Sequence, residues 1–317
     1  MEQQTIPQNN AAKYAFFYML SLVALIFMAM STGMIIFQII NKKIIDAAGT
    51  LPGMFDEGAM KFAISAIIIA APIYYIMTWQ INKNLLSGKL DKEAGVRKWL
   101  THFILFVSSV VMIGWFIAIV YNFLEGELTL KFILKAATAI FIAAAIFSYY
   151  LYDTKREIIT GAKSKILRAY FYGSLVLVLA AFISSFFFIA SPFETRARKE
   201  DNAILERFDR IDSAISTYYG EQKKIPTVLD ELLKDQTLYY LKDEDIADSL
   251  TKVRFDYKVT GERAYKLCAT FKTSNKDKKD VRYNYFYERW PHDAGYQCLP
   301  QKIRNDAKGI APAEPVR

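Results

Sequence analysis

Hydrophobic residues are concentrated in the first 190 positions of the chain, where five long apolar runs alternate with short polar segments. Each run is about 20 residues or longer, which is the length that a helix needs to cross about 30 Å of hydrocarbon. None of them alternates with a strand period, and a single strand could not span a bilayer because its backbone groups would stay unpaired in lipid. The predicted spanning helices are Ala15–Ile40, Phe62–Ile81, Phe103–Leu124, Phe132–Leu151 and Ala169–Ala190.

The hydrophobic pattern changes after Ser191-Pro192, where a charged amphipathic segment begins. Between Arg196 and Tyr219 the apolar residues recur at intervals of four and three positions, so they form one stripe along a predicted helix. Such a stripe needs a partner surface, and we expect it to pack on a sheet formed by the residues that follow.

Short segments with strand-like alternation come after this helix. Residues 253–259 and 264–271 flank the turn Thr260-Gly261-Glu262, which predicts a hairpin. A third strand is predicted at 281–287, in the sequence VRYNYFY. The predicted fold class is therefore an α-helical membrane bundle of five transmembrane helices, followed by a small α+β soluble domain that pairs a helix with an antiparallel sheet.

This pattern divides the chain into four parts. The whole chain is 53% hydrophobic, and the apolar excess is spread unevenly along it. The predicted parts are a cytoplasmic N-terminal tail at 1–14, a five-helix transmembrane domain at 15–190, an exported α+β domain at 191–303 and a disordered tail at 304–317.

The charged residues orient the bundle. Residues 1–190 carry 16 Lys and Arg against 10 Asp and Glu, whereas residues 191–317 carry 24 against 22. Most of the excess of positive charge in residues 1–190 lies in two loops, 82–102 and 152–168. The positive-inside rule then places these loops and the N-terminus in the cytoplasm and the C-terminal domain outside it. The net charge of +8 thus reflects topology, and we expect no nucleic acid among the partners.

Few polar residues lie inside the apolar runs. Lys135 is the one charged residue within a predicted span, about one turn from its external end. It is interpreted either as a ligand or ion contact or as a side chain that extends to the outer interface. Gln38 and Gln80 lie near the ends of their spans, where interfacial hydrogen bonding or a transport path would explain them.

Both cysteines of the chain, Cys268 and Cys298, fall in the predicted exported domain. An oxidising compartment permits a disulfide between them, across a separation of 30 positions. Two other interpretations stay open. The two thiolates could bind zinc together with His292 and Asp293, although no Cys-x-x-Cys spacing is present, or they could be free thiols.

An aromatic group surrounds the predicted third strand. Tyr283, Tyr285, Tyr287 and Trp290 can serve as core and sheet cover or as a binding platform. Trp290 is followed by Pro291, so it is the best candidate for an exposed aromatic residue. We therefore predict an interaction surface that contains Trp290 and His292.

The bundle resembles a known family of bacterial polytopic membrane proteins. The resemblance is carried by VRKWLTHFILF (Val96–Phe106), NFLEGELTLKFILKA (Asn122–Ala136) and FSYYLYDTKRE (Phe147–Glu157), and it covers roughly Ala15–Arg198. The family is described as domain of unknown function 5671. The resemblance implies a bacterial inner membrane, and it supplies no functional residues.

The C-terminal domain is similar to the soluble part of pseudopilins, the pilin-like proteins of type II secretion and type IV pili. The charged helix, the pair Tyr218-Tyr219, Pro226 and the hairpin follow one another in the pseudopilin order. The preceding span begins AYFYGSLVLVL and lacks the pilin processing sequence and its buried Glu. The resemblance therefore implies a fold for about residues 195–300, and no processing or polymerisation.

No nucleophile motif, phosphate-binding loop or HExxH metal motif is present in the sequence, and no cofactor is predicted. We predict an inner-membrane structural or interaction protein that presents its exported domain to an envelope partner, such as pilus or secretion machinery. A transporter or channel formed by the five helices is the alternative, and a membrane enzyme or sensor is the second.

Overall fold

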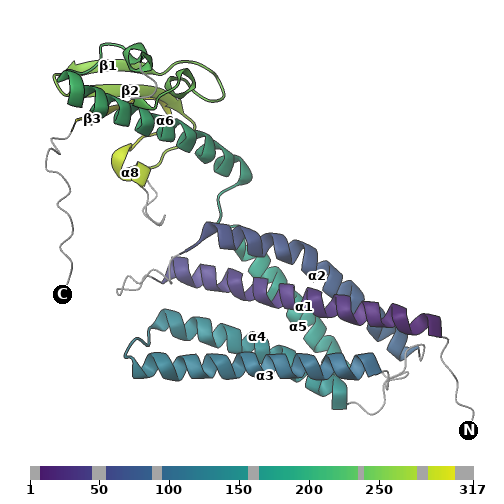
Figure 1. Cartoon of the computed structure of the whole chain (residues 1–317). Helices are drawn as coiled ribbons and strands as arrows, with labels where there is room; N and C mark the ends of the chain where they lie inside the picture. The colour runs from purple at the N-terminus through teal and green to yellow at the C-terminus, as the bar shows by residue number, and fades with distance from the viewer. Residues whose placement is uncertain are drawn as a thin grey trace, which may run out of the picture. The chain divides into compact units, whose positions relative to one another are not determined.

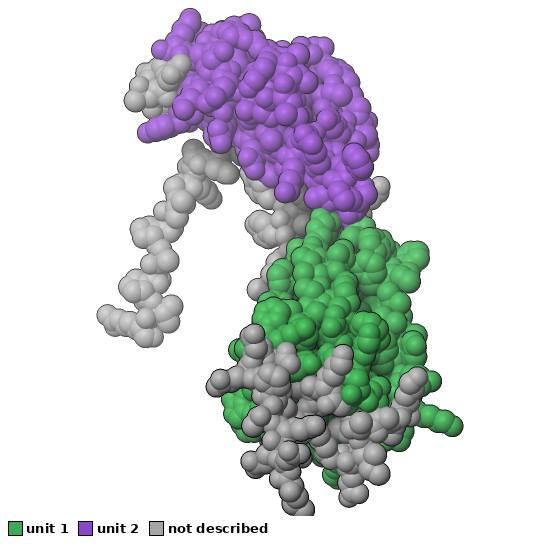
Figure 2. All heavy atoms as spheres, turned by 90° about the vertical axis from the view of Figure 1, so that its right-hand side faces the viewer, with its two compact units in different colours: residues 1–189 green, residues 190–317 purple. Residues whose placement is uncertain are grey.

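The chain forms two compact units, residues 1–189 and 190–317, which are described separately (Figure 2). The structure is a computed structural model. It describes residues 8–44, 55–87, 95–155, 164–234, 239–276 and 285–303.

The first unit is a bundle of five helices, all long and apolar enough to cross a membrane (Figure 1). They are α1 (Gln8–Lys43), α2 (Glu57–Leu86), α3 (Gly95–Leu124), α4 (Leu130–Lys155) and α5 (Lys165–Ser185). The number and order of the predicted spans are thereby confirmed.

The helices differ in length from the predicted spans. α3 begins at Gly95 instead of Phe103, and α5 ends at Ser185 instead of Ala190. Hydropathy marks only the apolar part of a helix, whereas polar caps extend it by a turn or more. The side chains of Asp56 and Ser164 act as such caps, since they accept hydrogen bonds from backbone N–H groups in the first turns of α2 and α5.

The bundle is built from two paired arrangements, α1 against α2 and α3 against α4, with α5 crossing them (Figure 1). Small and aliphatic residues such as Ala63 and Ile67 of α2 are buried in one cluster with Ile35 and Leu25 of α1. The link from α3 to α4 is short because Gly126 takes a left-handed conformation, with φ of 74°.

The second unit begins with α6 (Pro192–Gln222), a 31-residue amphipathic helix. The hydroxyl of Ser191 caps its start by accepting from the N–H of Glu194, and Pro192 occupies the first turn, where proline is favoured. The helix ends at Lys223, which is left-handed with φ of 55°. Two short 3₁₀ helices, η2 (Leu229–Leu233) and η3 (Asp243–Ile246), pack beside it.

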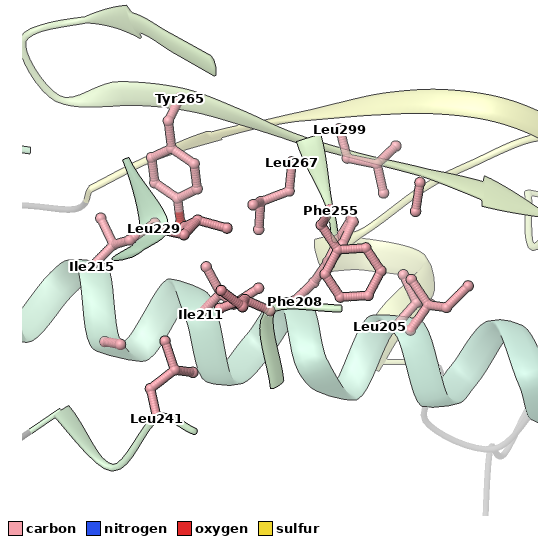
Figure 3. Packing of buried hydrophobic residues seen from close by; sticks show 14 of the residues in the cluster. Leu205, Phe208, Ile211, Ile215, Leu229, Leu241, Phe255, Tyr265, Leu267 and Leu299 are labelled. Atoms are coloured by element: carbon pink, nitrogen blue, oxygen red, sulfur yellow. The ribbon is translucent and has the colours of Figure 1, made fainter. Parts of the chain in front are cut away.

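A three-stranded antiparallel sheet lies over α6 (Figures 1 and 3). Its strands are β1 (Asp256–Gly261), β2 (Ala264–Phe271) and β3 (Gly295–Lys302), in the order β1-β2-β3. Phe208 and Ile211 of α6 meet Tyr265 and Leu267 of β2 in the core, and all four are fully buried (Figure 3). The predicted fold class is confirmed.

The prediction of a third strand at 281–287 is wrong for residues 285–287, and residues 281–284 lie outside the described residues. Residues 285–289 form a short helix, α8 (Tyr285–Arg289), and β3 lies further along the chain. The alternating pattern of VRYNYFY is as strong as that of β3, whereas Pro300 inside GYQCLPQK weakens its strand signal. Pro300 is tolerated because β3 is an edge strand. The predicted tail, 304–317, lies outside the described residues.

Candidate functional site

A disulfide closes the second unit. Cys268 of β2 and Cys298 of β3 are direct partners in the sheet register, with their Cα atoms 4.0 Å apart, and their sulfurs are bonded. The predicted disulfide is thereby confirmed, and neither sulfur is a thiolate that could ligate zinc. Across the described ranges, no group of three or more His, Cys, Asp or Glu side chains could hold a metal ion.

The two faces of the sheet have different chemistry. Side chains alternate between the faces along a strand, so the burial of Tyr265, Leu267 and Phe271 on α6 assigns their neighbours to the opposite face. We call this opposite side the outer sheet face. It is defined by Asp256, Lys258, Lys266, Cys268, Thr270, Tyr296, Cys298, Pro300 and Lys302.

Three lysines lie together on the outer sheet face. Lys258 of β1 is directly opposite Lys266 of β2, and Lys302 is the diagonal neighbour of Lys266 on β3. Like charges directly opposite one another destabilise a sheet. The arrangement therefore places positive charge where folding alone disfavours it.

None of these three lysines forms an ion pair with any residue that the structure describes. Other basic residues of the unit are paired: Lys272 contacts Glu200 at 2.6 Å, and the Arg254 guanidinium contacts Asp230. Lysines on edge strands commonly protect a sheet from pairing with another chain. That explanation covers Lys258 and Lys302 but not Lys266, which lies on the central strand.

A side-chain hydrogen bond crosses the outer sheet face near the disulfide. The hydroxyl of Tyr296 on β3 donates to Oδ2 of Asp256 on β1 at 2.6 Å, so the side chain reaches across β2. This hydrogen bond to the carboxylate raises the pKa of Tyr296. Cys268 beneath is 1% exposed. A side-chain hydrogen bond from β3 to β1 therefore orders this part of the outer sheet face.

The prediction that Trp290 is exposed is wrong. Trp290 is fully buried against Phe208, and its indole Nε1 donates to Oδ1 of Asp209 on α6 at 2.6 Å. Arg289 pairs with Asp209 and Asp212 of α6. These bonds draw the end of α8 into the core, which is why the following proline does not expose the ring.

His292 is buried as well, with 1% of its surface exposed, so its predicted place on an interaction surface is also wrong. The ring stacks on Phe271 with centroids 4.0 Å apart, and Nδ1 lies 3.0 Å from the carbonyl oxygen of Trp290. Nε2 has no hydrogen-bond partner among the residues described. Burial lowers the pKa of His292.

The three polar residues that were predicted as contacts within the spans lie on three different helices. Oε1 of Gln38 accepts from the backbone N–H of Asp56 at 2.8 Å, so this buried side chain ties the end of α1 to the start of α2. Gln80 is half buried on α2, and its backbone carbonyl accepts from Asn84. Lys135 is half buried on α4. A role for Lys135 or Gln80 in binding stays a prediction.

The bundle contains a buried ion pair that the hydropathy pattern does not predict. The guanidinium of Arg97 on α3 contacts Oδ2 of Asp153 on α4 at 2.7 Å, and the Arg97 side chain is 6% exposed. Both residues fall outside the apolar runs, so hydropathy assigned them to loops. The available signal was the apolar flank of Arg97 in VRKWL, which is compatible with a helix that starts earlier.

These features define a class: a multi-pass membrane protein with a five-helix bundle and a disulfide-closed α+β C-terminal unit. Residues 14–150 match the family described as "Domain of unknown function (DUF5671)", which confirms the resemblance over most of α1 to α4. No curated protein and no solved structure matches the chain. The pseudopilin resemblance of the C-terminal unit stays a prediction.

Proposed function

We propose that the protein is an inner-membrane anchor that presents its C-terminal unit outside the cytoplasm to an acidic segment of an envelope protein. The observation that carries this proposal is the outer sheet face, where Lys258, Lys266 and Lys302 cluster without ion pairs to other described residues. A carboxylate-rich partner offsets the repulsion between the lysines, which no ion pair with a described residue relieves.

The location outside the cytoplasm is supported by two independent features. Lysine and arginine residues flank the ends of α2, α3, α4 and α5 that the positive-inside rule assigns to the cytoplasm. The disulfide between Cys268 and Cys298 fits an oxidising compartment, since cytosolic thiols are kept reduced. A component of pilus or secretion machinery is the specific partner hypothesis, and it rests on the pseudopilin resemblance.

The test is site-specific photo-crosslinking in living cells with the full-length protein. A photoreactive residue at Thr270 reports on the outer sheet face, and one at Ser216, exposed on α6, is the matched control. We expect a discrete cross-linked product at position 270 only. Mass spectrometry of the product should find the crosslink within an acidic stretch of the partner.

Charge reversal makes the test specific. Lys258→Glu with Lys266→Glu should reduce the product at position 270 at least five-fold, because two attractions become repulsions. The control, Lys224→Glu with Lys234→Glu, changes the same net charge at exposed positions away from the sheet and should leave the yield unchanged. Equal products at positions 270 and 216, or a product that survives the sheet reversal, would contradict the proposal.

A further inference from the structure

The helical bundle contains a large cavity of about 830 Å³. It lies between α4 and α5, and residues of α1 and α2 complete its lining. It arises because α5 runs obliquely and contacts α4 at few positions (Figure 1). Small residues on both walls keep it open: Ala144 and Ala145 on α4, and Ala169 and Gly173 on α5. Its volume is within the range of sites that bind small molecules.

The lining changes character along the cavity. One part is formed by Leu25, Met28, Phe141, Ile142 and Leu177, which offer only hydrocarbon and sulfur. An apolar cavity of this kind does not hold water stably, because water needs polar partners. In a membrane-spanning unit, a hydrocarbon chain is the ligand that suits this part.

Hydroxyl groups gather at the other end of the cavity, toward the start of α5 and the end of α4. The Tyr170 hydroxyl donates to Oγ of Ser148 at 3.1 Å, joining α5 to α4. Thr78 and Tyr149 also line this end. Hydroxyls both donate and accept, so they can bind the polar head of a ligand whose chain lies among the apolar residues.

A second, smaller cavity of about 50 Å³ continues from this polar end. Thr78, Tyr149 and Tyr150 line both cavities, and Asp153 borders the smaller one. Asp153 is the partner of the buried Arg97. Charged groups in a membrane-spanning unit are expensive and usually pair or serve a ligand. This pair joins α3 to α4. Asp153 is the one charged side chain among the lining residues described for the two cavities.

The geometry points to a binding site for one amphipathic lipid, with its hydrocarbon chain between α4 and α5 and its polar head at the hydroxyl groups near Asp153. The head forms hydrogen bonds, which a phospholipid, a polyprenyl phosphate and a fatty acid all supply. The site is independent of the outer sheet face, so either proposal can fail alone.

The experiment is to quantify lipid that stays with the full-length protein after purification in mild detergent. Lipid is extracted from the monodisperse fraction and identified by mass spectrometry, which distinguishes the three sources. We expect about one lipid of a single class for each wild-type chain. No lipid above the detergent background would overturn the inference.

A cavity-filling variant and a matched control make the measurement specific. An added Cβ meets nothing within 4 Å at Gly173, which lines the cavity, or at Gly114, which is exposed on α3. Gly173→Phe should lower retained lipid at least five-fold, and Gly114→Phe should leave it at the wild-type value. Equal retention in the two variants would overturn the inference.

Two further variants keep the test decisive if Gly173→Phe does not fold. Ala145→Phe fills the cavity from α4, and Ala137→Phe is its control on the exposed side of the same helix. The combined change Tyr149→Phe and Tyr170→Phe removes two hydroxyls with little change in volume and should reduce retention about three-fold or more. Unchanged retention in that double variant would overturn the placement of the head.

Discussion

The helices α3 and α6 are nearly equal in length, 30 and 31 residues, yet they bury opposite kinds of side chain. On α3, Phe106 is 66% exposed, whereas Arg97 is 5% exposed. On α6, Phe208 and Ile211 are fully buried, and Arg210 is exposed. The same chain therefore contains one unit that turns its largest apolar residues outward and one that turns them inward.

The difference follows from the solvent that each unit faces. In water, burying apolar surface drives α6 onto its sheet, at roughly 25 cal/mol for each Å². Between helices in lipid that force is nearly absent, so close packing of small residues and polar contacts hold the bundle together. Ala63 of α2 and the pair Arg97–Asp153 are such contacts. Equivalent substitutions in the two units should thus have unequal effects.

The largest expected effect concerns two phenylalanines. Phe208→Ala should lower the free energy of unfolding of the C-terminal unit by about 3–5 kcal/mol, because it leaves a cavity among Phe255, Phe271 and Trp290. Phe106→Ala removes the same side chain from an exposed position and should change stability by about 0.5 kcal/mol or less. Hydrogen exchange at the amides of β2 and α3 measures both in the full-length protein. Similar losses would contradict the comparison.

Removal of the disulfide should lower the stability of the C-terminal unit and leave that of the bundle unchanged. Replacing Cys268 and Cys298 with Ala should destabilise the C-terminal unit by roughly 3–4 kcal/mol, because the open chain gains entropy when unfolded. The chain has no other cysteine, so the bundle should be unaffected. Hydrogen exchange before and after reduction checks this. Increased exchange in α1 to α4 after reduction would show that the bundle depends on the C-terminal unit.

Substitution of the buried ion pair tests whether polar contacts stabilise the bundle. Asp153→Ala leaves Arg97 buried and uncompensated, and should destabilise the bundle by about 3 kcal/mol. The double change Arg97→Met with Asp153→Met should recover most of that loss, because it removes both charges. Thermal denaturation in detergent is the measurement, with the exposed Lys83→Ala as control. An Asp153→Ala variant as stable as wild type would show that the ion pair does not stabilise the bundle.

The smallest expected effect is a pH dependence confined to the C-terminal unit. Burial lowers the pKa of His292, so the folded unit resists a proton that the unfolded chain accepts below about pH 6.5. Stability should therefore fall as the pH decreases from about 7.5 to 5. Asp201 and Asp293 oppose this shift, and Lys276 adds to it.

His292→Phe keeps a ring against Phe271 and should flatten the pH dependence. Melting of the C-terminal unit across this pH range is the measurement. The range stays above the ordinary pKa of carboxyl groups, so Glu231, whose pKa is lowered by the Thr227 hydroxyl, should not contribute. An equal slope in the variant would assign the dependence to other groups.

The fold was predictable where one physical effect dominated. Five apolar runs predict five spans, and the 4-3 spacing of Ile204, Phe208 and Ile211 predicts the buried stripe of α6. The third strand was not predictable, because VRYNYFY and GYQCLPQK carry similar local signals. The choice between them depends on the register that pairs Cys298 with Cys268, which is a long-range contact.

The candidate sites were less predictable than the fold. The proline after Trp290 suggests that the ring is exposed. The ring is buried because it bonds to Asp209, which is 81 positions away in the chain. The partners Arg97 and Asp153 are 56 positions apart and lie beyond the apolar runs. The grouping of Lys258, Lys266 and Lys302 depends on strand register. Each feature arises when distant residues meet, which local periodicity does not encode.

We propose that the C-terminal unit lies outside the cytoplasm, and cysteine labelling from one side of the membrane tests this location. Ser216→Cys places a thiol on the exposed side of α6, and Ser87→Cys places one at the end of α2, while the native cysteines stay in their disulfide. With a membrane-impermeant maleimide, we predict labelling of Cys at position 216 in intact cells and at position 87 only after permeabilisation. The reverse pattern would contradict the account.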